Sequence, residues 1–181
     1  MPRPSSAVSA PRSSSYADTL AWLYSLQLFG IKLGLETTQR LINELDVAPR
    51  NARVVHVAGT NGKGSVCAMI ESIGRAAGRR TGLFTSPHLV TFRERIRLNG
   101  EMIAEQAVAD GLMKIYELTK EWDFTPTFFE VVTALALKYF RDADADLIVL
   151  ETGMGGRLDS TNAVQANVSV ITPCRCACIV Q

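Results

Sequence analysis

The chain has 181 residues, of which 47% are hydrophobic and 20% are charged, and its net charge is +1. This length and composition indicate a globular domain with a hydrophobic core, and the near-neutral charge excludes a general electrostatic attraction to nucleic acid or to anionic membranes. The longest apolar runs are short, such as "LIVL" at 147–150, whereas a membrane-spanning helix needs roughly 18 apolar residues. We therefore expect neither a nucleic-acid partner nor a membrane.

The two ends of the chain differ from the rest in composition. Residues 1–15 are rich in proline and serine, with two arginines and no acidic residue, which predicts a disordered extension and leaves an organelle transit peptide as the alternative. Cys67 lies alone in a helical pattern and is expected to be buried. The other three cysteines fall in a C-x-C-x-C tail, a spacing that differs from that of zinc sites. The absence of a spaced disulfide framework favours a reducing, cytoplasmic compartment.

Hydrophobic periodicity and turn residues divide the chain into alternating helices and strands. Asp18 can cap the first helix, and Asn99-Gly100 is a strong hairpin signal. In chain order, the predicted elements are a helix at 18–28, a loop at 29–35, a helix at 36–45, a strand at 53–59, a helix at 64–77, a strand at 80–87, a hairpin at 91–103, helices near 104–121 and 127–141, a strand at 146–151, a glycine-rich loop at 152–162 and a strand at 167–172. Buried strands that alternate with helices predict an α/β fold with a mostly parallel sheet and helices on both faces, close to the P-loop type.

The segment "VVHVAGTNGKGS" (54–65) combines a strand, a glycine-rich loop and the start of a helix. Such a loop can turn successive N–H groups toward an anion, and the helix N-terminus adds partial positive charge. Lys63 supplies a full charge for the outer phosphates, and Ser65 supplies a hydroxyl for phosphate or Mg²⁺. The glycine spacing is shorter than in common nucleotide loops, and a simple tight turn is the alternative.

Polar side chains also follow two other predicted strands. Glu151 ends the strand at 146–151, where a carboxylate can bind Mg²⁺ or can be a satisfied strand-end acid. Ser86 lies at the end of the strand at 80–87 and can place its hydroxyl near the same metal. His88 can serve as a ligand or as a general base, and the alternative is a purely structural histidine. His56 lies inside a strand and is expected in the core.

Three further groups of residues are chemically suggestive. Arg157 and Asp159 in the glycine-rich loop can orient a substrate or can be solvated. The segment "RERIR" (93–97) is predicted to place its three arginines on one strand face, either to hold a phosphate or carboxylate or simply to meet solvent. In "TPTFFE" (125–130) the two phenylalanines can stack on a flat heterocycle that Glu130 hydrogen-bonds, or they can belong to the core.

Four blocks together resemble a known family. "VAGTNGKGS", "TSPHLVTFRERIRLNG", "TFFEVVTALAL" and "ETGMGGRLDSTNAV" occur in order between about Tyr16 and Thr172. They resemble the N-terminal domain of the folylpolyglutamate synthase and dihydrofolate synthase family, in the Mur-ligase superfamily of ATP-dependent amide ligases. The resemblance implies a P-loop-like Mur-ligase central domain at residues 16–172.

The resemblance also implies roles for individual residues. Lys63 and Glu151 would be catalytic, and Ser86 and Glu151 would bind Mg²⁺. The residues implied for ATP are Asn61, Gly62, Lys63, Gly64 and Ser65. The residues implied for the pterin end of the substrate are Ile31, Lys32, Leu33, Thr127, Phe128, Phe129, Glu130, Arg157 and Asp159.

The implied reaction adds L-glutamate to dihydropteroate or to a reduced folate through an acyl phosphate, with ATP and Mg²⁺, in a cytoplasmic monomer. In the family, the chain continues after this domain with a metal-binding histidine and a C-terminal domain, whereas here it reads "PCRCACIVQ" (173–181). We therefore expect an atypical tail on a truncated ligase. A non-catalytic ATP-binding fragment, another Mur-type amide ligase and a metal-binding cysteine tail are the alternatives.

Overall fold

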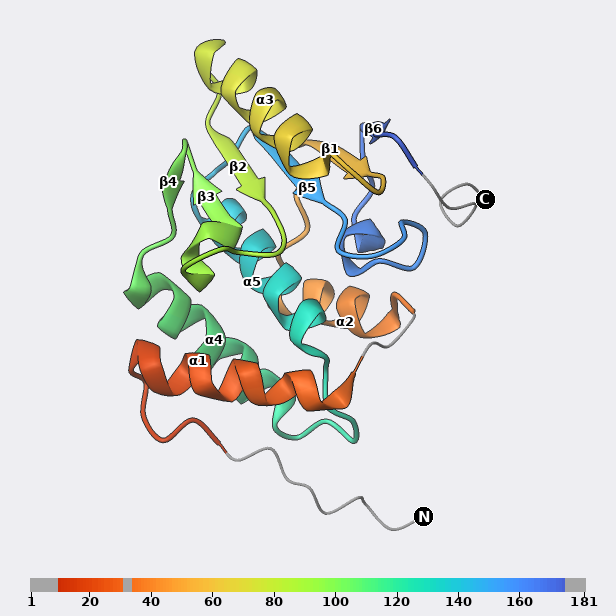
Figure 1. Ribbon diagram of the computed structural model, residues 1–181. Coiled ribbons are helices and arrows are strands. Elements are labelled where there is room, and N and C mark those ends of the chain that lie inside the picture. Colours follow the sequence, from red (N-terminus) through yellow and green to blue (C-terminus); the bar gives the residue numbers. More distant parts are fainter. Residues whose placement is uncertain (1–9, 31–33, 175–181) are drawn as a thin grey trace.

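The computed structural model describes residues 10–30 and 34–174, apart from the side chain of Phe29. Helices and strands alternate along the chain as the sequence predicts (Figure 1). The α-helices are α1 (Tyr16–Ser25), α2 (Glu36–Leu45), α3 (Lys63–Ala76), α4 (Glu105–Thr119) and α5 (Phe128–Asp142). The strands are β1 (Arg53–Ala58), β2 (Thr81–Phe84), β3 (Ile96–Leu98), β4 (Glu101–Met102), β5 (Leu147–Glu151) and β6 (Val168–Ile171). The 3-10 helices are η1 (Leu26–Phe29), η2 (Phe92–Arg95) and η3 (Ser160–Ala163).

The strands form one sheet in the order β4-β3-β2-β5-β1-β6. Strands β2, β5, β1 and β6 are parallel, and β3 and β4 join one edge in the antiparallel sense. The β3–β4 hairpin turns at Asn99 and Gly100, which both have positive φ, as the Asn-Gly signal predicts. The prediction of a mostly parallel sheet is therefore confirmed.

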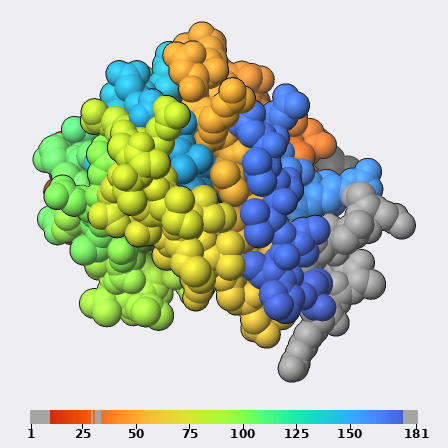
Figure 2. Space-filling view, turned by 90° about the horizontal axis from the view of Figure 1, so that it is seen from above, coloured from red at the N-terminus to blue at the C-terminus, as the bar shows by residue number. Residues whose placement is uncertain are grey.

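Helices cover both faces of the sheet, which confirms the predicted layering. On one face, Cys67 of α3 is fully buried against Val57, Leu83 and Val149 of the strands. In the space-filling view, α3 (yellow) lies between the hairpin (green) and the segment around β6 (dark blue) (Figure 2). On the other face, α5 packs between the sheet and the layer formed by α1, α2 and α4 (Figure 1).

Helix α5 is the central element of the larger core. Most of its residues are buried, including Val131, Leu135 and Phe140. A capping box begins the helix: the Thr127 hydroxyl accepts from the backbone N–H of Glu130, and the Glu130 carboxylate accepts from the N–H of Thr127. These paired bonds satisfy N–H groups that have no partner inside the helix. The first residues of α5 are therefore held in one conformation.

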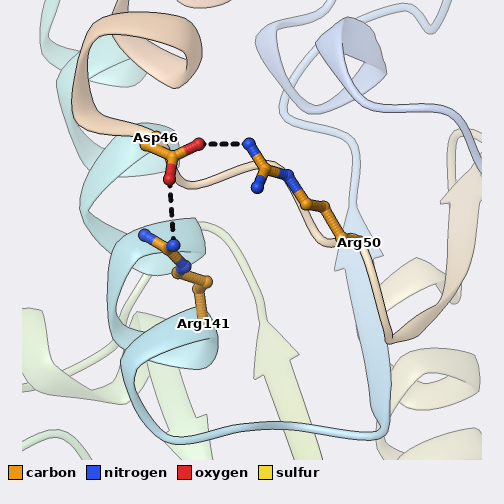
Figure 3. A network of polar contacts seen from close by, with 3 residues as sticks. All are labelled: Asp46, Arg50 and Arg141. Atoms are coloured by element: carbon orange, nitrogen blue, oxygen red, sulfur yellow. Dashed lines mark hydrogen bonds and ion pairs between the residues drawn. The ribbon is translucent and has the colours of Figure 1, made fainter.

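A surface ion network fixes the chain between α2 and β1 (Figure 3). Asp46 has φ 52° at the end of α2, and its carboxylate contacts Arg50 at 2.5 Å and Arg141 of α5 at 3.0 Å. The Asp46 side chain is 52% exposed, so each pair is worth at most about 1 kcal/mol. The network orients the connection rather than stabilising the core.

Some local predictions are wrong. The first helix begins at Tyr16, because Ser15 caps it, and Asp18 lies inside the helix. The segment predicted as the first arm of the hairpin forms η2 before β3, so Arg93, Arg95 and Arg97 do not share a strand face.

No helix within residues 10–30 and 34–174 is both long and apolar enough to cross a membrane.

Candidate functional site

Three loops meet at the carboxyl-terminal edge of the sheet. They follow β1, β5 and β2, which are neighbouring parallel strands. Because parallel strands end at the same edge, residues distant in the chain come together there, and this edge is where α/β sheets bind ligands. The phosphate-type loop, Glu151 and Ser86 all lie at this edge.

The loop after β1 takes a backbone shape that depends on glycine. Gly59 has φ +142°, and a Cβ there would lie 1.9 Å from the hydroxyl oxygen of Thr172. Gly62 has φ +80° and occupies the N-cap of α3. The Lys63 ammonium folds back over the loop and donates to the carbonyl oxygen of Gly59 at 3.0 Å. The loop therefore forms a compact turn with a cation held over it.

The N-terminus of α3 has donors that remain available to a ligand. The N–H groups of Lys63, Gly64 and Ser65 precede the first intrahelical bond, from Val66 N to Gly62 O, and Gly62 provides no side-chain cap. Such uncapped N–H groups, together with the helix dipole, attract anions. Further back in the loop, the N–H groups of Thr60 and Asn61 both donate to the carbonyl of Pro173. The predicted ATP residues thus include three successive helix donors that have no acceptor among the described residues.

Glu151 is a buried carboxylate that faces this helix end. It is 5% exposed, and its Oε2 accepts from the backbone N–H of Ser86 at 3.0 Å. A Cβ on Gly64 would lie 3.6 Å from that same oxygen, so the carboxylate reaches the first turn of α3. Burial raises the pKa of Glu151, and the Ser86 N–H, Lys63 and Arg95 oppose this shift.

The donor set around Glu151 suits Mg²⁺ better than a transition metal. Within the described residues, no group of three or more His, Cys, Asp and Glu side chains could hold a metal ion. Mg²⁺ commonly takes only one or two protein oxygens, with phosphate and water completing its shell. A buried carboxylate without an ion-pair partner in the described residues, next to a serine, fits that requirement.

A cavity of about 490 Å³ opens beside the phosphate-type loop. Its walls come from the loops after β2 and β5, from η1, η2 and η3, and from the first residues of α3 and α5. The lining residues are Gln27, Gly30, Lys63, Ser86, Pro87, Arg95, Thr127, Phe128, Phe129, Gly153, Met154, Leu158, Asp159 and Ser160. The cavity therefore joins a cationic end, at Lys63, to an aromatic wall.

The aromatic wall is held by packing. The Phe128 ring stacks on Tyr24 of α1, with centroids 5.8 Å apart and planes 13° apart. The Phe129 ring packs on Phe84, with centroids 5.8 Å apart, and a Cβ on Gly153 would come within 2.5 Å of it. The two rings therefore pack against the core and also line the cavity.

Asp159 organises the glycine-rich loop and is 6% exposed. Its Oδ2 accepts from the N–H groups of Gly153 and Met154 at 3.0 and 2.9 Å. Its Oδ1 accepts from the N–H and hydroxyl of Thr161 at 3.0 and 2.5 Å. The Thr161 hydroxyl also lies 2.6 Å from Nε2 of His56, whose expected core position is confirmed. Asp159 thus shapes the cavity wall through four hydrogen bonds.

Other predicted site residues lie elsewhere. Arg157 is exposed and is not among the lining residues. Glu130 is 1% exposed, and its carboxylate caps α5 and is not among the lining residues. Ile31, Lys32 and Leu33 lie outside the described residues. The structure brings together Lys63, Ser86, Glu151, Asp159 and the segment Thr127–Phe129.

Sequence reasoning missed Gln27 and Gly30, which line the cavity but come from a segment without a chemical signal. It also missed Tyr24, which stacks on Phe128 and is marked by no motif. Arg95 was one of three arginines predicted to share a strand face, but it alone lines the cavity. Arg95 is the last residue of the 3-10 turn η2, whereas Arg97 lies in β3.

The fold and this edge define a P-loop-like α/β domain of the Mur-ligase type, with a phosphate-type loop, the buried carboxylate of Glu151 and an aromatic-lined cavity. No protein-family model matches the chain. It is 40% identical over 164 residues to the dihydrofolate synthase/folylpolyglutamate synthase of Bacillus subtilis, a match that covers 88% of this chain and 38% of that protein.

Solved structures agree with this similarity. The bifunctional folylpolyglutamate synthase/dihydrofolate synthase of Yersinia pestis, complexed with AMPPNP and a Mn ion, superposes with a TM-score of 0.80 at 38% identity over 90% of this chain and 39% of that chain. Escherichia coli FolC in complex with DHPP and ADP gives a TM-score of 0.77 at 38% identity over 95% and 39%. Over most of its length, the chain is homologous to the dihydrofolate synthase/folylpolyglutamate synthase family. It spans about two fifths of the length of these relatives.

Proposed function

We propose that this chain forms the ATP- and pteroate-binding part of a ligase that joins L-glutamate to dihydropteroate or to a reduced folate. One observation carries the proposal: the uncapped start of α3, Lys63 and the buried Glu151 meet beside an aromatic cavity at one sheet edge. Relatives named as dihydrofolate and folylpolyglutamate synthases favour this substrate class over other amide ligases. They also favour it over a non-catalytic ATP-binding role.

For ATP, we propose that the backbone from Asn61 to Ser65 surrounds the phosphates. The free N–H groups of Lys63, Gly64 and Ser65 supply the anion-binding donors. The Lys63 ammonium sits over the loop, where a charge can stabilise the transferring phosphoryl group. Its bond to Gly59 O exchanges for a phosphate oxygen when nucleotide binds.

For the metal, we propose Ser86 and Glu151 as the protein ligands. Their donor atoms are oxygens, and the backbone of Ser86 is already tied to the Glu151 carboxylate. When bound, Mg²⁺ supplies positive charge that offsets the charge of the phosphates. Glu151 also holds the loop after β2 in place through the same hydrogen bond.

For the pterin end of the substrate, we propose the wall formed by Thr127, Phe128 and Phe129. The flat ring system lies against the two phenylalanines, whose packing keeps them rigid. Asp159 keeps the opposite loop in shape, and Glu130 fixes the start of α5. The proposed set also includes Arg157 and the segment Ile31, Lys32 and Leu33, which lies outside the described residues.

The proposed reaction has two steps. First, a carboxylate oxygen of the substrate bonds to the γ-phosphorus of ATP, while the bond from that phosphorus to the bridging oxygen breaks and ADP leaves. Then the amine of L-glutamate forms a C–N bond to the acyl carbon, the acyl C–O bond breaks, phosphate leaves and the amine proton passes to solvent or base. We further propose that the protein is a cytoplasmic monomer.

The proposal is tested by a chimera, since the chain spans about two fifths of its relatives. Residues 16–172 replace the matching segment of the B. subtilis relative, and ADP release is measured with dihydropteroate, ATP and Mg²⁺, with and without L-glutamate. The proposal predicts glutamate-dependent ADP release and a dihydrofolate product by mass spectrometry. The same chimera with Lys63→Met, shown by circular dichroism to be folded, is predicted to be inactive. A folded chimera that turns over no pteroate or folate substrate would refute the proposal.

A further inference from the structure

The three arginines near the second loop have different surroundings. Arg93 donates from Nε to the carbonyl of Ile103 at 2.6 Å and pairs with Glu105 at 3.6 Å. Arg97 lies on β3 opposite Leu83 and is not among the lining residues of the cavity. Arg95 is 8% exposed and lines the cavity. One guanidinium of the three is thus directed to the site.

Arg95 is a buried charge without an acidic partner. No carboxylate in residues 10–30 and 34–174 forms an ion pair with it. Its Nε donates to Nδ1 of His88 at 2.8 Å. A guanidinium has five N–H donors, so the two Nη groups remain without an acceptor in the part of the chain that the structure describes. A buried charge of this kind is costly unless something pairs with it.

The Arg95 guanidinium is also held in one orientation. Its Cζ lies 5.5 Å from the centre of the Phe128 ring. His88, which accepts from Nε, contacts the Tyr24 hydroxyl through Nε2 at 3.4 Å, and Tyr24 stacks on Phe128. His88 and Phe128 therefore contact the guanidinium, and Tyr24 supports both of them, before any ligand arrives. Preorganisation of this kind lowers the cost of binding.

The cavity has a second cationic side chain besides Lys63, namely Arg95. Lys63 and Arg95 are the cationic lining residues that the structure describes, and Lys63 belongs to the phosphate loop through Gly59. Burial lowers the pKa of Arg95, and Tyr24 and Glu151 oppose that shift. Arg95 thus lies against Phe128 of the aromatic wall and within the electrostatic influence of Glu151. The planar fork of arginine matches a carboxylate in two parallel hydrogen bonds.

We propose that Arg95 binds the carboxylate of a flat aromatic acid that occupies this cavity, and so selects acids over neutral analogues. This inference rests on the proposed function. It adds a residue that determines specificity for the substrate carboxylate, the group that ATP activates in the proposed reaction. His88 is a positioning residue that orients Arg95.

The test compares two probes that differ only in that group. Pteroate and its carboxamide are titrated into the full chain by isothermal calorimetry. The wild-type protein is predicted to bind pteroate about 10- to 100-fold more tightly than the carboxamide, as expected for hydrogen bonds to a charged group. The Arg95→Met variant is predicted to lose this preference while keeping its affinity for the carboxamide within about threefold. The matched control Arg97→Met is predicted to keep the preference.

The outcomes separate this inference from the proposed function. Binding of both probes with equal affinity by the wild-type protein overturns the role of Arg95 and leaves the pteroate site standing, as does a retained preference in Arg95→Met. Binding of neither probe overturns both. If Arg95→Met does not fold, Arg95→Lys keeps the charge without the fork and is predicted to reduce the preference at least threefold. An unchanged preference there also contradicts the proposal.

Discussion

Replacing Asp159 with Asn tests whether this residue holds the wall of the cavity. Its carboxylate accepts four hydrogen bonds, three from backbone N–H groups and one from the Thr161 hydroxyl. Asparagine has one acceptor oxygen and places an NH₂ group where the second oxygen stood. The less costly orientation keeps the oxygen toward Gly153 and Met154 and turns the NH₂ toward Thr161.

The expected loss can be worked out from these contacts. The N–H of Thr161, a residue that is 1% exposed, loses its acceptor, which costs about 1–3 kcal/mol for a buried donor. The two remaining N–H bonds weaken by roughly 1 kcal/mol together because their acceptor is no longer charged. Asp159→Asn is therefore expected to lower the free energy of unfolding by about 2–4 kcal/mol.

Urea unfolding followed by circular dichroism measures this loss. Asp46→Asn is the matched control, because Asp46 also bonds two partners but at 52% exposure. Asparagine tolerates its positive φ, and its loss is expected to stay under about 1 kcal/mol. If Asp159→Asn costs no more than Asp46→Asn, the reasoning about the loop is wrong.

Two further predictions concern titratable groups. The carboxylate of Glu94 accepts hydrogen bonds from the N–H groups of Leu89, Val90 and Thr91, which hold its pKa at about 2, below the usual 4.5. The stabilisation that the ionised Glu94 gives the folded protein is therefore present above pH 4.5 and is lost as the pH falls to about 2. Thermal unfolding should show Glu94→Gln less stable than wild type at pH 7 and equal to it near pH 2; a difference that does not vary with pH contradicts this. Burial raises the pKa of Cys67 to about 12, so iodoacetamide at pH 8 should modify Cys67 only after unfolding, as read by peptide mass spectrometry, and modification of the native protein would disprove its burial.

The sequence predicts the elements of this fold well because its signals are local. Asn99-Gly100 specifies its hairpin through the positive φ that both residues adopt. The glycine-punctuated loop before Lys63 likewise specifies a strand-to-helix turn. Where the chain makes a 3-10 turn, as in η2, period-two alternation imitates a strand, and the faces of the arginines are predicted wrongly.

Some residues of the candidate site could likewise be predicted from the sequence, and others could not. Lys63, Ser86 and Glu151 could be placed together because neighbouring parallel strands end at one edge. The partners of Arg95 could not be predicted, because His88 and Tyr24 reach it through tertiary packing of separate elements. The Glu130 carboxylate caps α5 as part of a capping box. The sequence "TFFE" already contains the Thr-x-x-Glu pattern of that motif, so this role could have been predicted.

Binding of ATP with Mg²⁺ to the full chain tests the central claim most directly. Isothermal calorimetry compares wild type with Lys63→Met, and with Lys114→Met as a control for an exposed lysine on α4. The account predicts that wild type and the control bind alike, and that Lys63→Met binds about 10- to 100-fold more weakly because a charged hydrogen bond is lost. Absence of binding by the wild-type chain, or equal binding by a folded Lys63→Met variant, would contradict the assignment of this loop to ATP.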